Sequence, residues 1–422
     1  MRNKLKTFPV TKTFSIIWIA LISGLCFGVE KPGTPEQKAA EIHRSVLTID
    51  SHTDTPLQLV QQGFDMSVRH DARNEYSKVD FPRMKEGGLD GAFFAVFVSQ
   101  GPRNPDAYEK VMKRAVMLFD TIDAVVSRNK NIAGLAVSQA DAVRLKRLDK
   151  RAVFIGIENG YAIGKDISLI STFYLRGARY VTLCHSKNND ICDSSTDTIE
   201  HNGLSPFGVE VVRELNHVGV MIDVSHISDK SLKDVLSITE APVIASHSCA
   251  KALCDNPRNL SDDLLEAIAR NGGVVQMCIL SDYVKTPAPN PSRDSARAAV
   301  RLKFRDFDGL TDEEMKAARK EWKSINVQFP QKLANVSDVV DHIDHMVKVA
   351  GINHVGIGTD FDGGGGVEGC FDASEMGNIT LELVKRGYSK NEIRKIWGGN
   401  LMRVMNKTDE IGRKYKLSCR CN

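Results

Sequence analysis

Eight short runs of apolar, often β-branched residues recur along this 422-residue chain, and helical patterns separate most of them. Alternating strands and helices favour a parallel sheet, and near-continuous apolar strands are typical of sheets buried on both faces. We therefore predict an α/β fold, a closed (β/α)8 TIM-type barrel, with an open doubly wound sheet as the alternative. The predicted strands are Val46–Asp50, Ala92–Val98, Val153–Ile157, Tyr180–Leu183, Val218–Val224, Val243–Ala245, Gly273–Ile279 and Val355–Gly358.

Polar residues follow six of these strands at their C-terminal ends, which is where the active sites of such barrels lie. His52 and Asp54 follow the first strand, and residues two apart in an extended chain point the same way. Glu158 ends the third strand, while His226 and His247 follow the fifth and sixth. Imidazoles and carboxylates gathered at one rim suit a divalent metal ion of borderline softness, and zinc is the first choice. We therefore predict a metal site at the C-terminal rim.

The number of candidate ligands predicts more than one ion. Five protein ligands exceed what one tetrahedral zinc binds, so two zinc ions per chain are expected. Glu158 is the best-placed bridging residue, and a metal-bridging hydroxide of lowered pKa would be the nucleophile. Asp360, after the eighth strand, is a candidate for proton transfer. His185 is a candidate ligand or oxyanion donor, and Arg258 suits capture of a substrate carboxylate.

The N-terminus has the pattern of an export signal. Residues 1–13 carry four basic residues and no acidic one, and an uncharged apolar run follows up to Phe27. We predict that residues 1–28 are an export signal peptide, with an uncleaved anchor as the alternative. The protein is then exported, to the periplasm, the exterior or a membrane. Without the signal the chain is close to neutral, and no basic stripe predicts a nucleic-acid partner.

The rest of the chain is predicted to form one domain. Residues 29–45 are expected to be a linker and lead-in, and residues 46–422 a single catalytic barrel. The barrel is interrupted by an insertion near 282–331, which contains a charged helix at Thr311–Ser324. A segment this long between two strands is typical of a functional loop or lid, with a surface decoration as the alternative.

Asn335–Ala350 shows the periodicity of an amphipathic helix, and Ser337 is its expected N-cap. His342 and His345 lie off the apolar stripe of this helix, among acidic residues. We expect them to lie on a solvated helix face rather than in the metal site.

The cysteines are scattered and include no C-x-x-C pair, so a thiolate zinc site is not expected. Cys192 and Cys370 lie in loops rich in Gly and Asp, and they are candidates for a disulfide in an exported protein.

In combination, these strand-end motifs resemble the membrane (renal-type) dipeptidase family of the amidohydrolase superfamily. The resemblance spans roughly residues 46–405. It rests on DSHTDTP, GIENG, VTLCHS, IDVSH, ASHS, NPRN and GIGTDFDG. The H-x-D motif after the first strand distinguishes the dipeptidase branch from many other amidohydrolases, which have H-x-H there and a carbamylated Lys as the bridging ligand. This chain has His52, Asp54 and Glu158 at these positions, as the dipeptidase branch does.

The resemblance implies a metal ligand set, taken position by position. His52 and Asp54 match ligands of a first zinc, and Glu158 matches the bridging ligand. His226 and His247 match ligands of a second zinc.

The resemblance also implies roles around the metals. His185 matches the residue that polarises the scissile carbonyl, and Arg258 matches the residue that holds the substrate C-terminal carboxylate. Asp360 matches the general acid/base, and Tyr283 matches a further substrate contact. A homodimer is also implied.

The implied function is zinc-dependent hydrolysis of dipeptides, including those with a C-terminal D-residue. One alternative is a related amidohydrolase acting on N-acyl amino acids, lactones or β-lactams. The other is a catalytically inactive exported binding protein. The chain departs from the mammalian type in a longer segment before the eighth strand. It also lacks a GPI-type hydrophobic tail, so an anchor of that kind is not expected.

Overall fold

The structure is a computed structural model that describes residues 1, 6–9, 33–73, 77–307 and 310–418. Most of the predicted export signal, residues 1–28, lies outside the described residues. No helix in the described part of the chain is long and apolar enough to span a membrane.

The sheet is parallel throughout, and the strand order follows the chain: β1-β2-β4-β5-β6-β7-β8-β9, with β3 pairing only with β4. A bridge between Thr53 and Phe361 brings the segment after the last strand against the first, which closes the barrel. The strands are β1 Ile49–Thr53, β2 Gly91–Phe97, β3 Ala133–Leu135, β4 Arg151–Glu158, β5 Ala178–Thr182, β6 Met221–Asp223, β7 Ile244–Ser248, β8 Val274–Met277 and β9 Val355–Ile357.

The predicted α/β barrel is therefore confirmed, and each of the eight predicted strands overlaps a strand of the barrel path. The short strand β3 was not predicted, because its three residues, Ala-Gly-Leu, are too few to show a period.

Strand residues alternate between two cores, as the two-residue period of a strand requires. Phe93, Phe154 and Tyr180 point into the barrel, where they pack with apolar residues of the other strands and of the C-terminal helix. Their neighbours in sequence pack outward against the surrounding helices. Position 156 must be glycine, because a Cβ there would lie 2.0 Å from the Tyr180 ring.

Helices surround the barrel, and several begin at a Ser, Thr or Asn side chain that accepts a backbone N–H of the first turn. They are α1 Pro35–Ser45, α2 Pro56–Leu59, α3 Phe81–Glu86, α4 Pro105–Arg128, α5 Gln139–Arg147, α6 Leu169–Leu175, α7 Pro206–Val218, α8 Asp229–Ile238, α9 Asp262–Arg270, α10 Ser281–Val284, α11 Pro291–Lys303, α12 Asp312–Gln328, α13 Val336–Ala350, α14 Gly377–Lys385, α15 Lys390–Arg394 and α16 Asn400–Ser418.

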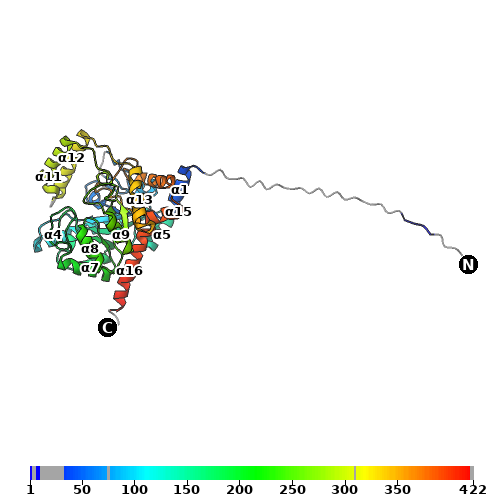
Figure 1. Cartoon of the computed structure of the whole chain (residues 1–422), viewed down its shortest axis with the longest axis horizontal. Helices are drawn as coiled ribbons and strands as arrows, with labels where there is room; N and C mark the ends of the chain where they lie inside the picture. The colour runs from blue at the N-terminus through cyan, green and yellow to red at the C-terminus, as the bar shows by residue number, and fades with distance from the viewer. Residues whose placement is uncertain (2–5, 10–32, 74–76, 308–309, 419–422) are drawn as a thin grey trace.

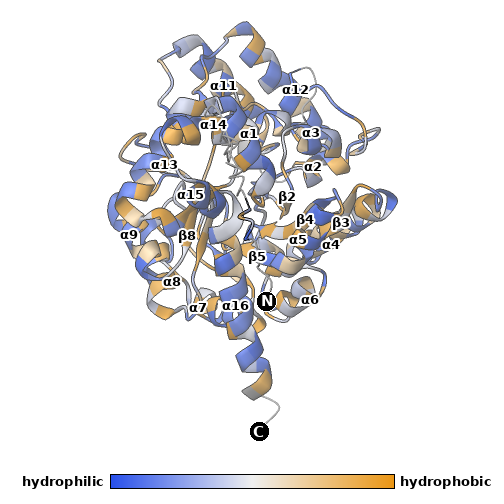
Figure 2. Cartoon of the chain, turned by 90° about the vertical axis from the view of Figure 1, so that its right-hand side faces the viewer, coloured by the Kyte–Doolittle hydropathy of each residue, from blue (hydrophilic) through white to orange (hydrophobic). Residues whose placement is uncertain are grey.

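Two additions to the barrel lie at opposite ends of the molecule. Leu401, Met402 and Met405 of α16 pack into the core inside the barrel, beneath the strands. Helices α11 and α12 form a hairpin that projects from the other end (Figures 1 and 2). The hairpin lies within the predicted insertion, and α12 contains most of the predicted charged helix.

Three details of the sequence analysis were wrong. The N-cap of helix α13 is Asn335 rather than Ser337, because Asn335 forms a reciprocal capping box with Asp338. His342 is buried, not solvated: its Nδ1 accepts the Ala250 N–H at 3.1 Å, and its Nε2 donates to the carbonyl oxygen of Val284 at 2.8 Å. This face of α13 covers loops after β7 and β8 whose backbone groups need partners.

The suggested disulfide between Cys192 and Cys370 is also wrong. Both residues are buried free thiols, as are the other four cysteines that the structure describes.

Candidate metal centre and active site

Glu158 lies at the centre of the barrel rim, between two groups of potential metal ligands. Its Oε2 is 3.4 Å from His52 Nε2, and its Oε1 is 3.1 Å from His226 Nε2 and 3.8 Å from His247 Nε2. Asp54 completes the group around His52, with 3.9 Å between its Oδ2 and His52 Nε2. Within each group the donor atoms lie no more than 4.8 Å apart, so each can hold one metal ion.

The His52 group is held by contacts inside the barrel. Tyr180 OH lies 2.8 Å from His52 Nδ1, which leaves Nε2 facing Glu158 without a hydrogen-bond partner. Asp54 Oδ1 is likewise buried, and within the described ranges it has no hydrogen-bond partner. Unpartnered buried polar atoms are costly and call for an explanation, and a metal ion between these atoms supplies one.

The second group is held by a carboxylate beneath it. Asp223 accepts hydrogen bonds from the Ser225 N–H, the Ser246 N–H and the Ser246 hydroxyl. The Ser246 hydroxyl also lies 2.9 Å from His247 Nδ1, which orients Nε2 of that ring toward the site. His226 adopts a positive φ of 71°. Such strained backbone in a non-glycine residue persists where the surroundings enforce it, typically at functional sites.

Charge in this cluster is distributed unevenly. Burial opposes ionisation of Glu158, but the imidazoles of His52 and His226 outweigh it and hold its carboxyl pKa well below the usual range. Burial likewise opposes the charge on His52, yet Glu158 raises the imidazole pKa to about 10. Burial lowers the pKa of His226 and of His247, so both rings are neutral, the form that binds metals.

Asp360 lies beside both groups, within ligand distance of His52 and His247. Its own positive φ of 57° starts a glycine loop in which the N–H groups of Gly363, Gly364 and Gly365 all donate to its carbonyl oxygen. A Cβ at Gly365 would lie 1.9 Å from the carbonyl oxygen of Thr359, so glycine is required there. Burial raises the pKa of Asp360 well above its usual range.

His185 lies on the open side of the cluster. Its Nε2 is 3.7 Å from Glu158 Oε1, and its ring lies against those of His226 and Phe97. Over a quarter of its side chain is exposed, so a ligand in the barrel mouth can reach it. Burial lowers its pKa, which favours the neutral ring.

Arg258 and Tyr283 lie next to the second group. Arg258 Nη2 donates to the carbonyl oxygen of His247 at 3.3 Å, while its Nε is buried without a partner. The guanidinium carbon lies 5.6 Å from the centre of the Tyr283 ring. A guanidinium held in this way can bind a planar carboxylate through two hydrogen bonds. Burial raises the pKa of Tyr283 to about 12, so its hydroxyl is neutral.

The model of the family described as membrane dipeptidase, peptidase family M19, matches residues 36–418. The chain belongs to the membrane dipeptidase family. The resemblance inferred from the strand-end motifs is thus confirmed, and the chain is a dipeptidase of a metallopeptidase family.

Named relatives share the similarity over most of their length. Human dipeptidase 3 is 30% identical over 392 residues, which cover 90% of this chain and 70% of the relative. Dipeptidase ataJ of Aspergillus terreus is 29% identical over 401 residues, covering 89% of this chain and 87% of the relative.

Solved structures of this family share the fold. The probable dipeptidase PvdM from Pseudomonas aeruginosa has a TM-score of 0.78 and 30% identity, covering 90% of this chain and all of that one. A Rhodobacter sphaeroides metallopeptidase, solved with a phosphinate mimic of the dipeptide L-Ala-D-Ala, has a TM-score of 0.69 at 21% identity. The match covers 86% of this chain and 99% of that one. At that identity the likeness shows the fold alone.

Within this dipeptidase fold, the structure brings together every site residue that the sequence predicted. Sequence reasoning missed the residues that hold them, chiefly Tyr180 and Asp223. A polar residue in the middle of an apolar strand was the available signal for Tyr180, because a buried hydroxyl needs a partner. Asp223 ends an apolar strand as Glu158 does, yet it hydrogen-bonds to backbone and hydroxyl groups instead of facing the cluster.

Proposed function

We propose that the protein is a dizinc exopeptidase that hydrolyses dipeptides, including those with a C-terminal D-residue. The observation that carries the proposal is the position of Glu158, whose two carboxylate oxygens face two separate ligand groups. Nitrogen and oxygen donors in sets of three or four suit zinc. When bound, two zinc ions would supply a water of lowered pKa as the nucleophile and would offset the charge of the buried carboxylates.

Asp360 is the proposed general acid/base. Its carboxyl lies beside the cluster, and burial raises its pKa well above the usual range, which favours a group that can accept a proton and release it again. We propose that it takes a proton from the attacking water and delivers it to the leaving amine. Hydrogen bonds from the glycine loop to the carbonyl oxygen of Asp360 fix the backbone of this residue.

His185 is proposed to donate a hydrogen bond to the scissile carbonyl oxygen. Its neutral ring carries one N–H, and this donor would be best matched to the negative charge that develops on the oxygen in the transition state. The contact of its ring with Phe97 limits how far the donor can move.

Arg258 is proposed to bind the free carboxylate of the substrate, with Tyr283 as a neighbouring contact. The buried Nε of Arg258 has no partner among the residues that the structure describes, so a bound carboxylate would satisfy it. Recognition of a carboxylate one residue from the scissile bond restricts the enzyme to dipeptides. We extend the substrate range to D-residues because of the L-Ala-D-Ala mimic in the Rhodobacter sphaeroides relative. Export and a homodimer, both predicted from the sequence, belong to the same proposal.

The test is a substrate panel with metal quantification on the same purified sample. We expect two zinc ions per chain and hydrolysis of L-Ala-L-Ala and L-Ala-D-Ala. L-Ala-L-Ala amide and L-Ala-L-Ala-L-Ala should be poor substrates, because neither presents a carboxylate at the right distance. Full activity after exhaustive chelation would overturn the metal mechanism, and faster turnover of the amide would overturn the role of Arg258.

A further inference from the structure

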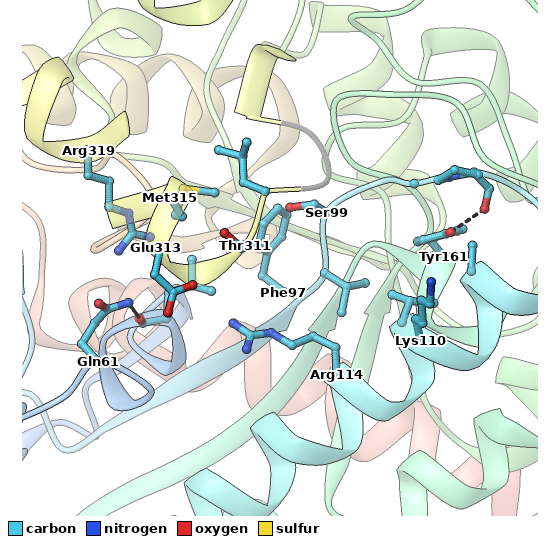
Figure 3. A pocket seen from close by; sticks show the side chains of 17 residues that line it. Gln61, Phe97, Ser99, Lys110, Arg114, Tyr161, Thr311, Glu313, Met315 and Arg319 are labelled. Carbon is cyan, nitrogen blue, oxygen red and sulfur yellow. Dashed lines mark hydrogen bonds between the residues drawn. The ribbon is translucent and has the colours of Figure 1, made fainter. Parts of the chain in front are cut away.

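A cavity of about 560 Å³ lies between the α11–α12 hairpin and the barrel rim, next to the metal centre. Its barrel side is formed by Phe97, Val98 and residues of α4, and its roof by residues at the start of α12 (Figure 3). This volume is within the range of small-molecule sites, and a single amino-acid side chain occupies only part of it.

Phe97 joins the cavity to the metal centre. It lines the cavity, and its ring lies edge-on to the imidazole of His185, with 4.8 Å between ring centres. In the sheet Phe97 is directly opposite Glu158. Tyr161, three residues after Glu158, lines the cavity as well. The cavity therefore begins where the cluster of metal ligands ends.

The strand order shows which part of a peptide this cavity faces. In the closed series of eight strands, β2 and β4 lie half a turn from β7 and β8. Arg258 and Tyr283 follow β7 and β8, whereas the cavity lies above β2 and β4. A dipeptide whose carboxylate binds Arg258 and whose scissile bond lies at the metal centre thus directs its N-terminal residue toward the cavity.

The charge of the lining indicates which side chains fit. Lys110, Arg114 and Arg319 line the cavity together with one acidic residue, Glu313. Figure 3 shows Arg114 of α4 and Glu313 of α12 extending into the space between the two helices. Among the described lining residues three are basic and one is acidic, and they surround apolar side chains such as Phe97 and Met315. This combination suits a long side chain with a terminal carboxylate.

We propose that this cavity is the specificity pocket for the N-terminal residue of the substrate, and that it selects long acidic side chains such as glutamate. The proposal rests on the proposed dipeptidase function. It assigns the hairpin a role in substrate choice and none in the chemical step.

The first test reduces the volume of the cavity. Met315→Trp adds bulk to the roof, and we expect kcat/KM for L-Glu-L-Ala relative to Gly-L-Ala to fall at least about tenfold, because pocket volume discriminates strongly between side chains. The matched control is Leu302→Trp, which places the same bulk on an exposed position of α11 outside the cavity. The control should keep the wild-type ratio. An equal ratio in Met315→Trp and wild type would overturn the proposal.

The second test removes charge. Arg114→Gln should lower the preference for L-Glu-L-Ala over the near-isosteric L-Gln-L-Ala by about fivefold, the upper end for a partly exposed ion pair. Lys113→Gln changes an exposed neighbour on the same helix outside the cavity and should leave the preference unchanged. Wild-type enzyme that hydrolyses all these dipeptides at similar rates would overturn the cavity proposal alone. Enzyme that hydrolyses none would overturn the proposed function, and the cavity's role with it.

Discussion

The barrel rim and the α11–α12 hairpin differ in how their side chains are held. At the rim, His52, Glu158 and His247 are almost fully buried, and hydrogen bonds to Tyr180 and Ser246 hold the Nδ1 atoms of the two imidazoles. The hairpin has a small core of its own, formed by Val300, Phe304, Ala318 and Ile325 with a few partly buried neighbours. Its outer face carries exposed ion pairs and exposed apolar residues such as Leu302.

From this difference we infer that the rim and the hairpin have separate functions. Metal binding and proton transfer need atoms held to within a fraction of an ångström, which a barrel core provides. Selection of a side chain needs a surface that can vary without disturbing the core, and an insertion with a separate core provides that. A change made in one of the two regions should therefore leave the other region unaffected.

The largest effect is expected for Glu158→Gln. An amide cannot act as a charged bridge between the two ligand groups, so bound zinc should fall from two ions toward none. We expect kcat/KM on L-Ala-L-Ala to drop at least about 10³-fold, more than the loss of a single transition-state donor costs.

Metal content by mass spectrometry and kinetics on the same sample would check this prediction. Glu266→Gln, on the exposed face of α9, is the matched control and should retain both zinc and activity. Two tightly bound zinc ions in Glu158→Gln would contradict the bridging role.

Asp360→Asn should affect turnover rather than binding. The amide keeps the shape of the side chain but cannot carry the proton, so kcat should fall by about 10²- to 10⁴-fold, with zinc retained and KM little changed. Because Asp360 also lies within ligand distance of His52 and His247, loss of zinc in this variant would instead identify it as a ligand. The measurement is kcat together with zinc content.

Metal binding should strengthen as pH rises. In the metal-free protein His52 has a pKa of about 10, raised above that of an unfolded chain, so its stabilising ion pair with Glu158 is present below pH 6.5 and is lost as pH rises toward 10. Zinc binding must displace this proton, so apparent affinity should rise by about tenfold per pH unit for one proton released.

Calorimetry in two buffers with different ionisation enthalpies would count the protons released. The midpoint of thermal unfolding of the metal-free protein should also fall between pH 7 and pH 9, while that of the zinc-loaded protein changes less. A zinc affinity independent of pH over this range would show that His52 is neutral before metal arrives.

The placement of the candidate ligands at one rim could be predicted from the sequence because each of them is local to one strand end. His52 and Asp54 share a face by strand geometry alone, and the ends of parallel strands must meet at one rim. The contacts that hold the ligands are different in kind. Tyr180 reaches His52 from a strand three places along the barrel path, and no local pattern encodes that pairing.

His342 and the cavity illustrate the same limit. The position of His342 on its helix predicted a solvated face, but the backbone of two distant loops packs there and bonds its ring. The insertion was visible as an oversized segment, whereas the cavity exists only because α12 lies over α4 and the end of β2. Such contacts between distant segments depend on the complete fold, and no local periodicity in the sequence reveals them.

The smallest catalytic effect is expected for Phe304→Ala, in the core of the hairpin. Truncating a buried Phe removes about 3–5 kcal/mol from the region that contains it, so amide exchange in α11 and α12 should accelerate strongly. Exchange in the barrel strands, zinc content and kcat on Gly-L-Ala should match the wild type. The matched variant Phe154→Ala removes the same atoms from the core inside the barrel and should lower the zinc content and midpoint of unfolding of the whole protein. Equal losses of zinc in both variants would show that the hairpin and the rim form one cooperative unit.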